Sequence, residues 1–302
     1  MRIGVAATPD VALPTLDWLL ASKHELLRVI TQPDRPSGRG QAIKASLVSQ
    51  WANQHGVELV KPLAIEELNG ALADLDLLIT IGFGRLLPEQ TFSIPTFGAI
   101  NLHFSLLPHY RGAAPVQRAI EAGEIRSGVT VFKLDSGMDT GPIYSSHSVD
   151  IDQSDRSFEL LQRLSQIGVV AICQALDSIE AAIAPVAQAG TSSRAMKISK
   201  EEAQINWNSP SHIIVNKIRG FYPQPCAWTV FRGAPLKIAQ SKISQETLAL
   251  APGELRVFNA KVLIGTSDLP LELELVIPAG KSEMNAVDWS RGARFADGER
   301  CG

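Results

Sequence analysis

The first half of the chain alternates short apolar runs with segments of helical periodicity. The apolar runs predict strands at 2–6, 26–31, 76–81, 98–103 and 128–134. The segments between and after them predict helices near 10–21, 42–54 and 115–122, and a longer helix over roughly 155–183. Thr8-Pro9 predicts the start of the first helix, because a capping residue is followed there by proline. Nearly continuous apolar strands alternating with helices indicate a Rossmann-like, mainly parallel sheet with helices on both faces.

The pattern changes after residue 189. Ala189 to Arg194 is small and polar, which is typical of a linker. Ser209-Pro210 predicts a helix that ends at Gly220, with Ser209 as its cap and Pro210 as its first residue. From Trp228 onward, short apolar runs separated by turn signals predict strands at 227–231, 235–239, 254–258, 261–265 and 271–277. We therefore expect an α/β domain over 1–189, a connection over 190–206 and a small β-barrel over 207–302.

The charge is distributed unevenly between these parts. Residues 1–202 carry 17 Lys+Arg and 22 Asp+Glu, whereas residues 203–302 carry 11 and 9. A basic segment beside an acidic domain is compatible with binding of a polyanion, and equally with an ordinary solvated surface.

The remaining composition indicates where the protein works. The three cysteines, Cys173, Cys226 and Cys301, have no disulfide or zinc spacing, which fits a reducing compartment. No apolar run is long enough to span a bilayer, and the chain begins on a predicted strand without a leader pattern. We therefore expect a cytoplasmic protein.

Three polar groups follow one another in an order that favours acyl transfer. Asn101 and His103 lie two apart on the predicted strand 98–103, so both should face the same side of the sheet. The loop 135–141 adds carboxylates and glycines. An amide donor beside an imidazole and a carboxylate can stabilise a negative oxygen on a tetrahedral carbon. Gly82 and Gly84, in another loop expected at the carboxyl ends of the strands, would let a flat ligand approach the backbone, although they could equally be ordinary turn glycines.

The sequence lacks the motifs of dinucleotide binding, of metal binding and of a serine nucleophile. The first strand is followed by Ala6-Ala7-Thr8-Pro9 and not by the glycine-rich dinucleotide motif. The six histidines show no metal-ligand spacing, so we expect no metal. Ser105 has no nucleophile-elbow motif around it.

With these residues in place, the chain resembles a known family. Asn101 to Pro108, Tyr110 to Pro115 and Asp135 to Gly141 are similar to motifs of the 10-formyltetrahydrofolate-dependent formyltransferases. Within that group, three further stretches resemble the methionyl-tRNA formyltransferases: Thr31 to Gly40, Lys197 to Trp207 and Pro278 to Lys281. The resemblance covers essentially the whole chain.

The resemblance implies a set of site residues. Asn101, His103 and Asp139 would be the catalytic residues, and Asp139 would favour the protonated form of His103. The folate site would contain Ser105, Leu106, Leu107, Pro108, Gly82, Gly84 and Leu86. The acceptor end of initiator tRNA would be recognised by an insertion over 32–43, and the C-terminal domain would be an OB-like barrel that contacts the tRNA body. The residues expected to bind tRNA are Arg35, Arg39, Lys217, Arg219 and Lys237.

The implied activity is transfer of the formyl group of 10-formyltetrahydrofolate to methionyl initiator tRNA by direct attack of the amine, in a protein expected to be monomeric. Phe104 and Gln41-Ala42 depart from the family pattern, and the latter make the insertion less basic. Two alternatives stay open. One is a formyltransferase acting on a nucleotide-linked amino sugar, and the other is a non-catalytic, folate-responsive RNA-binding protein.

Overall fold

The computed structural model describes residues 1–37, 42–246, 248–296 and 298–302, without the side chains of 35–37, 42 and 43. The chain divides into two units, each built from separate segments. The first unit contains Met1–Pro115, Arg126–Asp150 and Leu161–Ala195. The second unit contains Val116–Ile125, Ile151–Leu160 and Met196–Gly302. The second unit thus includes two short segments that the sequence pattern placed in the N-terminal domain.

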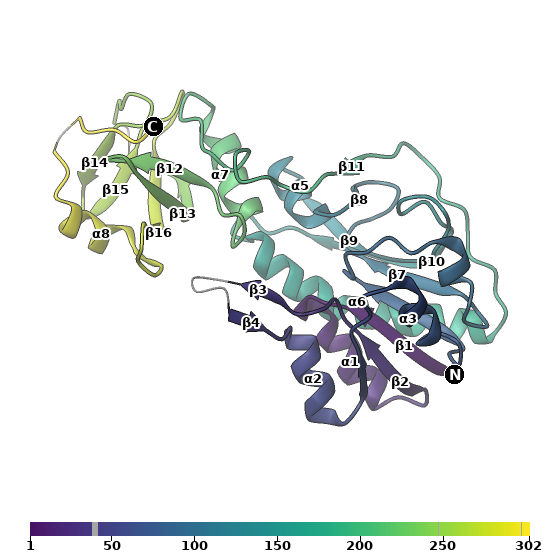
Figure 1. Cartoon of the computed structure of the whole chain (residues 1–302). Helices are drawn as coiled ribbons and strands as arrows, with labels where there is room; N and C mark the ends of the chain where they lie inside the picture. Colours follow the sequence, from purple (N-terminus) through teal and green to yellow (C-terminus); the bar gives the residue numbers. More distant parts are fainter. Residues whose placement is uncertain (38–41, 247, 297) are drawn as a thin grey trace. The chain divides into compact units, whose positions relative to one another are not determined.

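The first unit is organised around a seven-stranded sheet with the strand order β10-β9-β7-β6-β1-β2-β5 (Figure 1). Its strands are β1 (Arg2–Ala7), β2 (Glu25–Ile30), β5 (Glu58–Val60), β6 (Leu77–Ile81), β7 (Ala99–His103), β9 (Arg126–Lys133) and β10 (Ile143–Asp150). The pairs β5–β2, β2–β1, β1–β6 and β6–β7 are parallel. The mainly parallel α/β fold predicted from the apolar runs is confirmed.

Helices and short strands complete the first unit. They are η1 (Asp10–Ala12), α1 (Leu13–Leu20), β3 (Arg35–Ser37), β4 (Ala42–Lys44), α2 (Leu47–His55), α3 (Ile65–Gly70), α4 (Glu89–Phe92), β8 (Arg111–Gly112), β11 (Arg194–Ala195) and most of α6 (Ser157–Glu180). The helix α6 packs on the sheet where its Gly168 contacts Leu102 of β7. A side chain at position 168 would collide with that leucine. Leu102 therefore points toward α6, which leaves the opposite face of β7 to its neighbours Asn101 and His103.

Two strands of this sheet run against the others. The strand β9 is antiparallel to β7, with Ile100 paired to Lys133 and His103 paired to Thr130, and β10 is antiparallel to β9. The carboxyl end of β9 therefore lies beside the beginning of β7, where Leu134 N donates to Ala99 O (2.8 Å). Loop 135–141 thus begins beside the amino-terminal end of β7, yet its residues 135–139 line the same cavity as Gly82, Asn101 and His103, which agrees with the expectation that the loop lies near those groups.

Two predicted helix starts also differ from the structure. The helix predicted over 42–54 begins only at Leu47, because Ser46 caps it by accepting a hydrogen bond from Ser49 N (3.0 Å) and β4 precedes it. Thr8 does not cap the first helix; its hydroxyl accepts from Gln32 N (3.2 Å) and so ties the end of β1 to the chain after β2.

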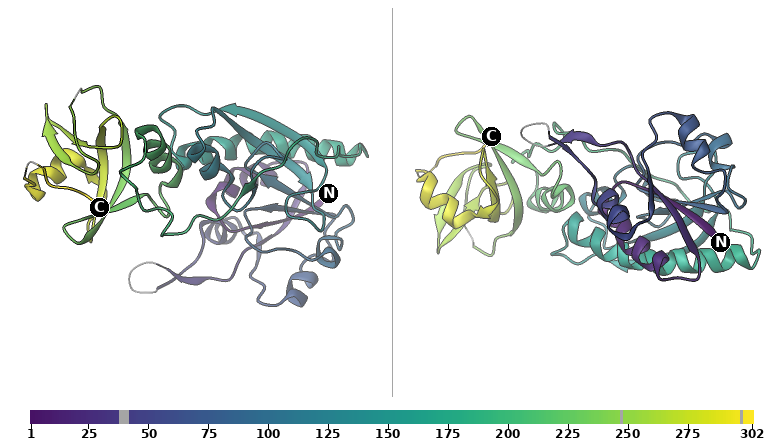
Figure 2. Two further views of the ribbon diagram at one scale, coloured as in Figure 1. Left: turned by 90° about the horizontal axis from the view of Figure 1, so that it is seen from above. Right: turned by 60° about the horizontal axis from the view of Figure 1, so that its bottom comes forward.

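The strands β3 and β4 form an antiparallel hairpin that extends away from the seven-stranded sheet (Figures 1 and 2). Its base is held where Lys61 Nζ donates to both carboxylate oxygens of Asp34 (2.8 and 2.7 Å). Arg39, predicted to bind tRNA, lies outside the described residues, and of Arg35 only the backbone is described.

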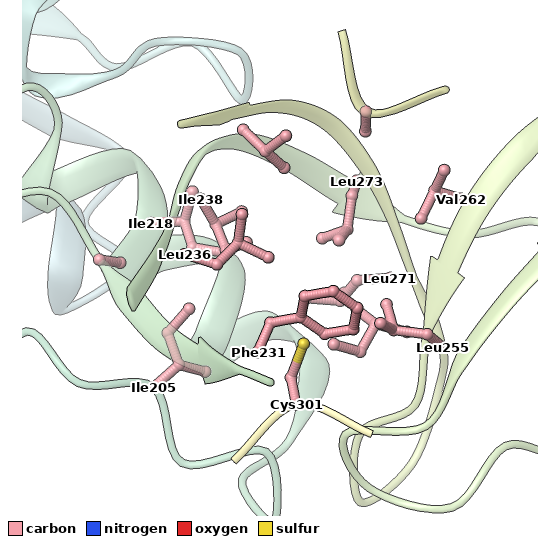
Figure 3. Close-up of a cluster of buried hydrophobic side chains, with 14 of the residues drawn as sticks. Ile205, Ile218, Phe231, Leu236, Ile238, Leu255, Val262, Leu271, Leu273 and Cys301 are labelled. Carbon is pink, nitrogen blue, oxygen red and sulfur yellow. The ribbon is translucent and has the colours of Figure 1, made fainter. Parts of the chain in front are cut away.

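The second unit contains an antiparallel sheet in the order β12-β13-β16-β15-β14, with β17 paired to β16. Its elements are α5 (Pro115–Glu121), α7 (Ser211–Phe221), β12 (Trp228–Phe231), β13 (Ala234–Ile243), β14 (Leu255–Phe258), β15 (Lys261–Ile264), β16 (Leu271–Pro278), β17 (Met284–Asn285) and α8 (Ala286–Ala293). Figure 3 shows side chains from several of these strands meeting Ile218 of α7 in one buried cluster. The predicted small C-terminal β domain is confirmed, and the structure shows that its sheet is antiparallel.

The helix α7 begins differently from the expectation that Ser209 caps it. Its first residue, Ser211, donates its backbone N–H to the carboxylate of Asp268 (2.7 Å). Hydrogen bonds from the backbone N–H groups of Ser211 and Leu269 lower the pKa of Asp268 to about 2. The helix also continues through Gly220, where the backbone comes so close to α5 that an added Cβ would lie 2.7 Å from Gln117 O. Within the described ranges, no helix is long and apolar enough to cross a bilayer.

Candidate active site

Three predicted side chains converge on one cavity of about 530 Å³ in the first unit. Asn101 and His103 come from β7, and Asp139 comes from the loop between β9 and β10. The Nδ1 atom of His103 lies 3.8 Å from Oδ2 of Asp139, and both side chains are largely buried. Loop 135–141 therefore begins beside the amino-terminal end of β7 and folds back over the face of the sheet that carries the amide and the imidazole.

The hydrogen-bond partner of His103 defines its tautomer. Its Nε2 lies 2.9 Å from the carbonyl oxygen of Tyr110. A carbonyl can only accept, so Nε2 carries a hydrogen and donates it. Burial lowers the pKa of His103, although the nearby Asp139 carboxylate opposes the shift. Burial thus favours the neutral imidazole and Asp139 favours the charged one, so the expectation that Asp139 favours the protonated form of His103 stays a prediction.

The amide of Asn101 is oriented by a residue that the sequence reasoning missed. The hydroxyl of Thr80 donates to Asn101 Oδ1 (2.7 Å), and the two residues are paired in register between β6 and β7. Among the described residues no acceptor contacts Asn101 Nδ2, so this nitrogen remains a donor for a group in the cavity. The signal for Thr80 was its hydroxyl within an otherwise apolar strand.

A short segment after β7 holds both titratable residues. Tyr110 O receives the imidazole hydrogen, and Gly112 N donates to Asp139 Oδ2 (2.7 Å). Gly112 has a φ of 122°, and a Cβ there would lie 2.7 Å from Ala195 O, because β8 pairs closely with β11. Only glycine allows the backbone amide to approach from this side.

The rest of the cavity wall is mostly apolar. Of the residues predicted for the folate site, Gly82, Gly84 and Leu86 line it, together with Leu87 and Met138. Leu86 and Met138 expose 76% and 54% of their surface, so large apolar groups lie open at the cavity.

The other predicted folate residues, Ser105, Leu106, Leu107 and Pro108, do not line this cavity. Ser105 is buried and its hydroxyl donates to His109 O (2.6 Å), which leads into Tyr110. Its own carbonyl accepts from the Thr130 hydroxyl (2.7 Å). These hydrogen bonds shape the loop that supports His103, and a role of the four residues in the folate site stays a prediction.

A second cavity of about 460 Å³ lies at the other end of β7. It is lined by Phe97, Lys133, Tyr144 and apolar residues after α6, and it contains neither an imidazole nor a carboxylate. The chemistry described above therefore belongs to the first cavity. Within the described ranges, no group of three or more potential metal ligands was found.

The basic residues of the second unit are largely engaged within it. Arg219 donates to the carbonyl oxygens of Asp155 (2.8 Å) and Asp152 (2.7 Å), which gives it a role in the fold, while its role in tRNA binding stays a prediction. Lys217 donates to Glu202 O (2.9 Å). Lys237 has no ion pair with any described residue.

Two family models and several full-length relatives match the chain. Residues 1–176 match the family described as formyl transferase, and residues 197–294 match the formyl transferase C-terminal domain. Methionyl-tRNA formyltransferases from Streptomyces griseus and Streptomyces avermitilis are 40% and 41% identical, each over 100% of both chains.

Solved structures agree in fold. A methionyl-tRNA formyltransferase from Clostridium thermocellum superposes with a TM-score of 0.60 at 17% identity, over 82% of this chain and 96% of its own. HypX from Aquifex aeolicus in complex with tetrahydrofolic acid gives 0.70 at 18% identity, over 96% of this chain and 47% of its own. The full-length sequence identity, together with both family matches, places the chain: it belongs to the formyl transferase family, among the methionyl-tRNA formyltransferases.

Proposed function

We propose that the chain transfers the formyl group of 10-formyltetrahydrofolate to the α-amino group of methionyl initiator tRNA. The observation that carries this proposal is the convergence of Asn101, His103 and Asp139 on one cavity. An amide donor, a neutral imidazole and a carboxylate are the groups that direct attack of an amine on a formyl carbon requires. Translation initiation would place the protein in the cytoplasm, and since one chain supplies all three groups, a monomer suffices.

The residues divide the proton and charge transfers between them. The attacking amine must lose one proton, and N10 of the folate must gain one. His103 Nδ1 accepts the first proton, because Nε2 is committed to Tyr110. Asp139 stabilises the imidazolium that results. His103 then returns the proton to N10 as the bond between N10 and the formyl carbon breaks.

Asn101 stabilises the negative charge that develops on the formyl oxygen. Its Nδ2 donates to that oxygen, while Thr80 holds the other end of the amide. The donor is oriented before the reaction begins, so little reorganisation is needed when the charge appears.

The cavity fits a folate in size and character. Pockets for small molecules usually measure about 300–1,000 Å³ and combine apolar walls with a few polar groups, and this cavity, at about 530 Å³, lies within that range. Leu86 and Met138 offer apolar surface to the rings, and Gly84 leaves room beside the backbone, because nothing lies within 4 Å of a Cβ built there.

For tRNA, we propose contacts from Arg35 and Arg39 of the segment 32–43 and from Lys217 and Lys237 in the second unit. Lys237 supports the proposal best, because no described carboxylate pairs with it. Lys217 donates one hydrogen bond to a backbone carbonyl at 2.9 Å, and its ammonium group retains further hydrogens to donate.

A release assay tests the function. The protein is mixed with 10-formyltetrahydrofolate and one acceptor at a time: methionyl initiator tRNA, a nucleotide-linked amino sugar, or none. We expect release of tetrahydrofolate, with formylation of the acceptor, only in the tRNA arm. Release in the sugar arm alone would support the first alternative, and folate binding without turnover in any arm would support the non-catalytic one.

A further inference from the structure

One side-chain amide is tied to both the catalytic loop and the segment that supports His103. Gln188, which follows α6, donates from Nε2 to Asp139 O (2.9 Å) and to Gly141 O (2.8 Å). Its Oε1 accepts from Arg111 Nε (3.2 Å) and Nη2 (2.5 Å). The orientation of the amide is unambiguous, since carbonyl oxygens can only accept and a guanidinium can only donate. All four hydrogen-bonding positions of the amide are therefore used.

The two carbonyls that Gln188 binds flank a strained turn. Asp139 has a φ of 55°, in the left-handed region that non-glycine residues seldom adopt. Such a conformation is energetically unfavourable and persists only where surrounding contacts hold it. At Gly141 there is no space for a side chain, because a Cβ would meet Lys133 O. The turn that carries the catalytic carboxylate therefore depends on outside support.

The first half of the same loop has its own internal support. Asp135 Oδ1 accepts from Gly137 N (3.1 Å) and from the Thr140 hydroxyl (2.7 Å). The second half has two external contacts: Gly112 N holds the Asp139 carboxylate, and Gln188 holds the backbone on both sides of Thr140. Gln188 is half-buried although most residues of 181–190 are exposed, as expected if its amide is held in place by these bonds.

We propose that Gln188 is a positioning residue for formyl transfer, acting through Asp139. Its amide holds the left-handed turn that brings the Asp139 carboxylate to 3.8 Å from His103, and Arg111 holds the amide. This inference rests on the proposed function and assigns a role to a residue outside the cavity.

Two substitutions separate the two sides of the amide. Gln188→Leu removes both sets of bonds. Gln188→Glu keeps an acceptor for Arg111 but turns a carboxylate toward two carbonyl oxygens, so only the contacts to the loop are lost. We expect both variants to lower kcat by roughly tenfold to a hundredfold, as misplacing a catalytic group does, with KM for folate and tRNA little changed. If Gln188→Glu retains wild-type kcat, the donors to the loop have no role and the proposal is overturned.

The matched control is Gln174→Glu. Gln174 lies on α6 in the same unit, and its Oε1 lies 2.9 Å from His147 Nε2, away from loop 135–141. This variant should retain wild-type kcat. A loss equal to that of Gln188→Glu would show that a glutamate substitution in this unit acts through general destabilisation, and the specific role of Gln188 would then be lost.

A double-substitution cycle tests whether Gln188 acts through Asp139. In an Asp139→Asn background, Gln188→Leu should cause little further loss of kcat, because residues that act as a unit are not additive. A further loss as large as in the wild type would overturn the proposal. If instead Asp139→Asn alone leaves kcat unchanged, the proposed mechanism fails at Asp139, and this outcome is distinct from failure at Gln188.

Discussion

At the scale of single residues, Asn101 depends on Thr80 for its orientation. Asn101→Ala removes the donor to the developing negative oxygen and should lower kcat by about 10²–10³. Thr80→Val keeps the shape of the strand residue but removes the hydroxyl that holds Asn101 Oδ1, so its loss should be smaller. Steady-state kinetics with both substrates measure the two effects. A Thr80→Val enzyme as slow as Asn101→Ala would mean that the hydroxyl, and not the amide, is the donor.

The pKa of His103 should depend on the charge of Asp139. Burial lowers the pKa of His103, and the Asp139 carboxylate acts in the opposite direction. Removing that charge in Asp139→Asn leaves only the hydrogen bond to Tyr110 O opposing burial, so the pKa of the imidazole should fall further while kcat drops. Titration of the His103 ring by NMR in the free protein measures the shift. A pKa that rises or stays constant would remove Asp139 as the electrostatic partner.

At the scale of elements, Gly220 makes α7 sensitive to size. Alanine in place of glycine normally stabilises a helix by about 1 kcal/mol, but at position 220 its Cβ would lie 2.7 Å from Gln117 O. We therefore expect Gly220→Ala to lower the thermal unfolding midpoint. Gly292→Ala on α8 is the control, because nothing lies within 4 Å of its added Cβ. That variant should be as stable as the wild type or more so, and a midpoint equally lowered in both would contradict the contact between α5 and α7.

The elements also indicate what could be read from the sequence. Strand alternation correctly placed Asn101 and His103 on one face, and the apolar runs gave most strands of both units. The direction of β9 was not readable, because a buried antiparallel strand and a buried parallel one have the same apolar pattern. Asp139 was identified by resemblance, and its supports depend on hydrogen bonds that span the chain, such as the bond from Gln188 to a residue 49 positions away. No local spacing encodes such a contact.

The charge count left the role of the basic stretch open for a related reason. Arg219 belongs to a basic stretch that suggested a polyanion surface, yet its guanidinium reaches carbonyl groups 64 and 67 residues away. Burial lowers the pKa of Arg219, as expected for a side chain turned inward. Counting charges along a segment cannot distinguish a cation that supports the fold from one that faces solvent.

At the scale of the whole molecule, tRNA binding should depend on salt. Each phosphate contact that is lost should reduce the slope of log affinity against log salt by about one. Lys237→Ala should show such a reduction. Lys261→Ala is the matched control, because its ammonium already pairs with Glu246 (3.0 Å) and Glu272 (3.7 Å) in the same unit. Filter binding of methionyl initiator tRNA over a salt series measures both slopes, and equal slopes for wild type and Lys237→Ala would exclude Lys237 from the interface.

The segmented make-up of the second unit limits how the protein can be divided. Gly220 packs against Gln117, and Arg219 binds the carbonyls of Asp152 and Asp155. All three partners precede Met196 in the sequence. A C-terminal fragment expressed from residue 197 would lack those partners, so one side of α7 would be exposed and the guanidinium of Arg219 would lose both carbonyl acceptors. Gene fusions and truncations intended to isolate an RNA-binding module should therefore carry the two earlier segments with it.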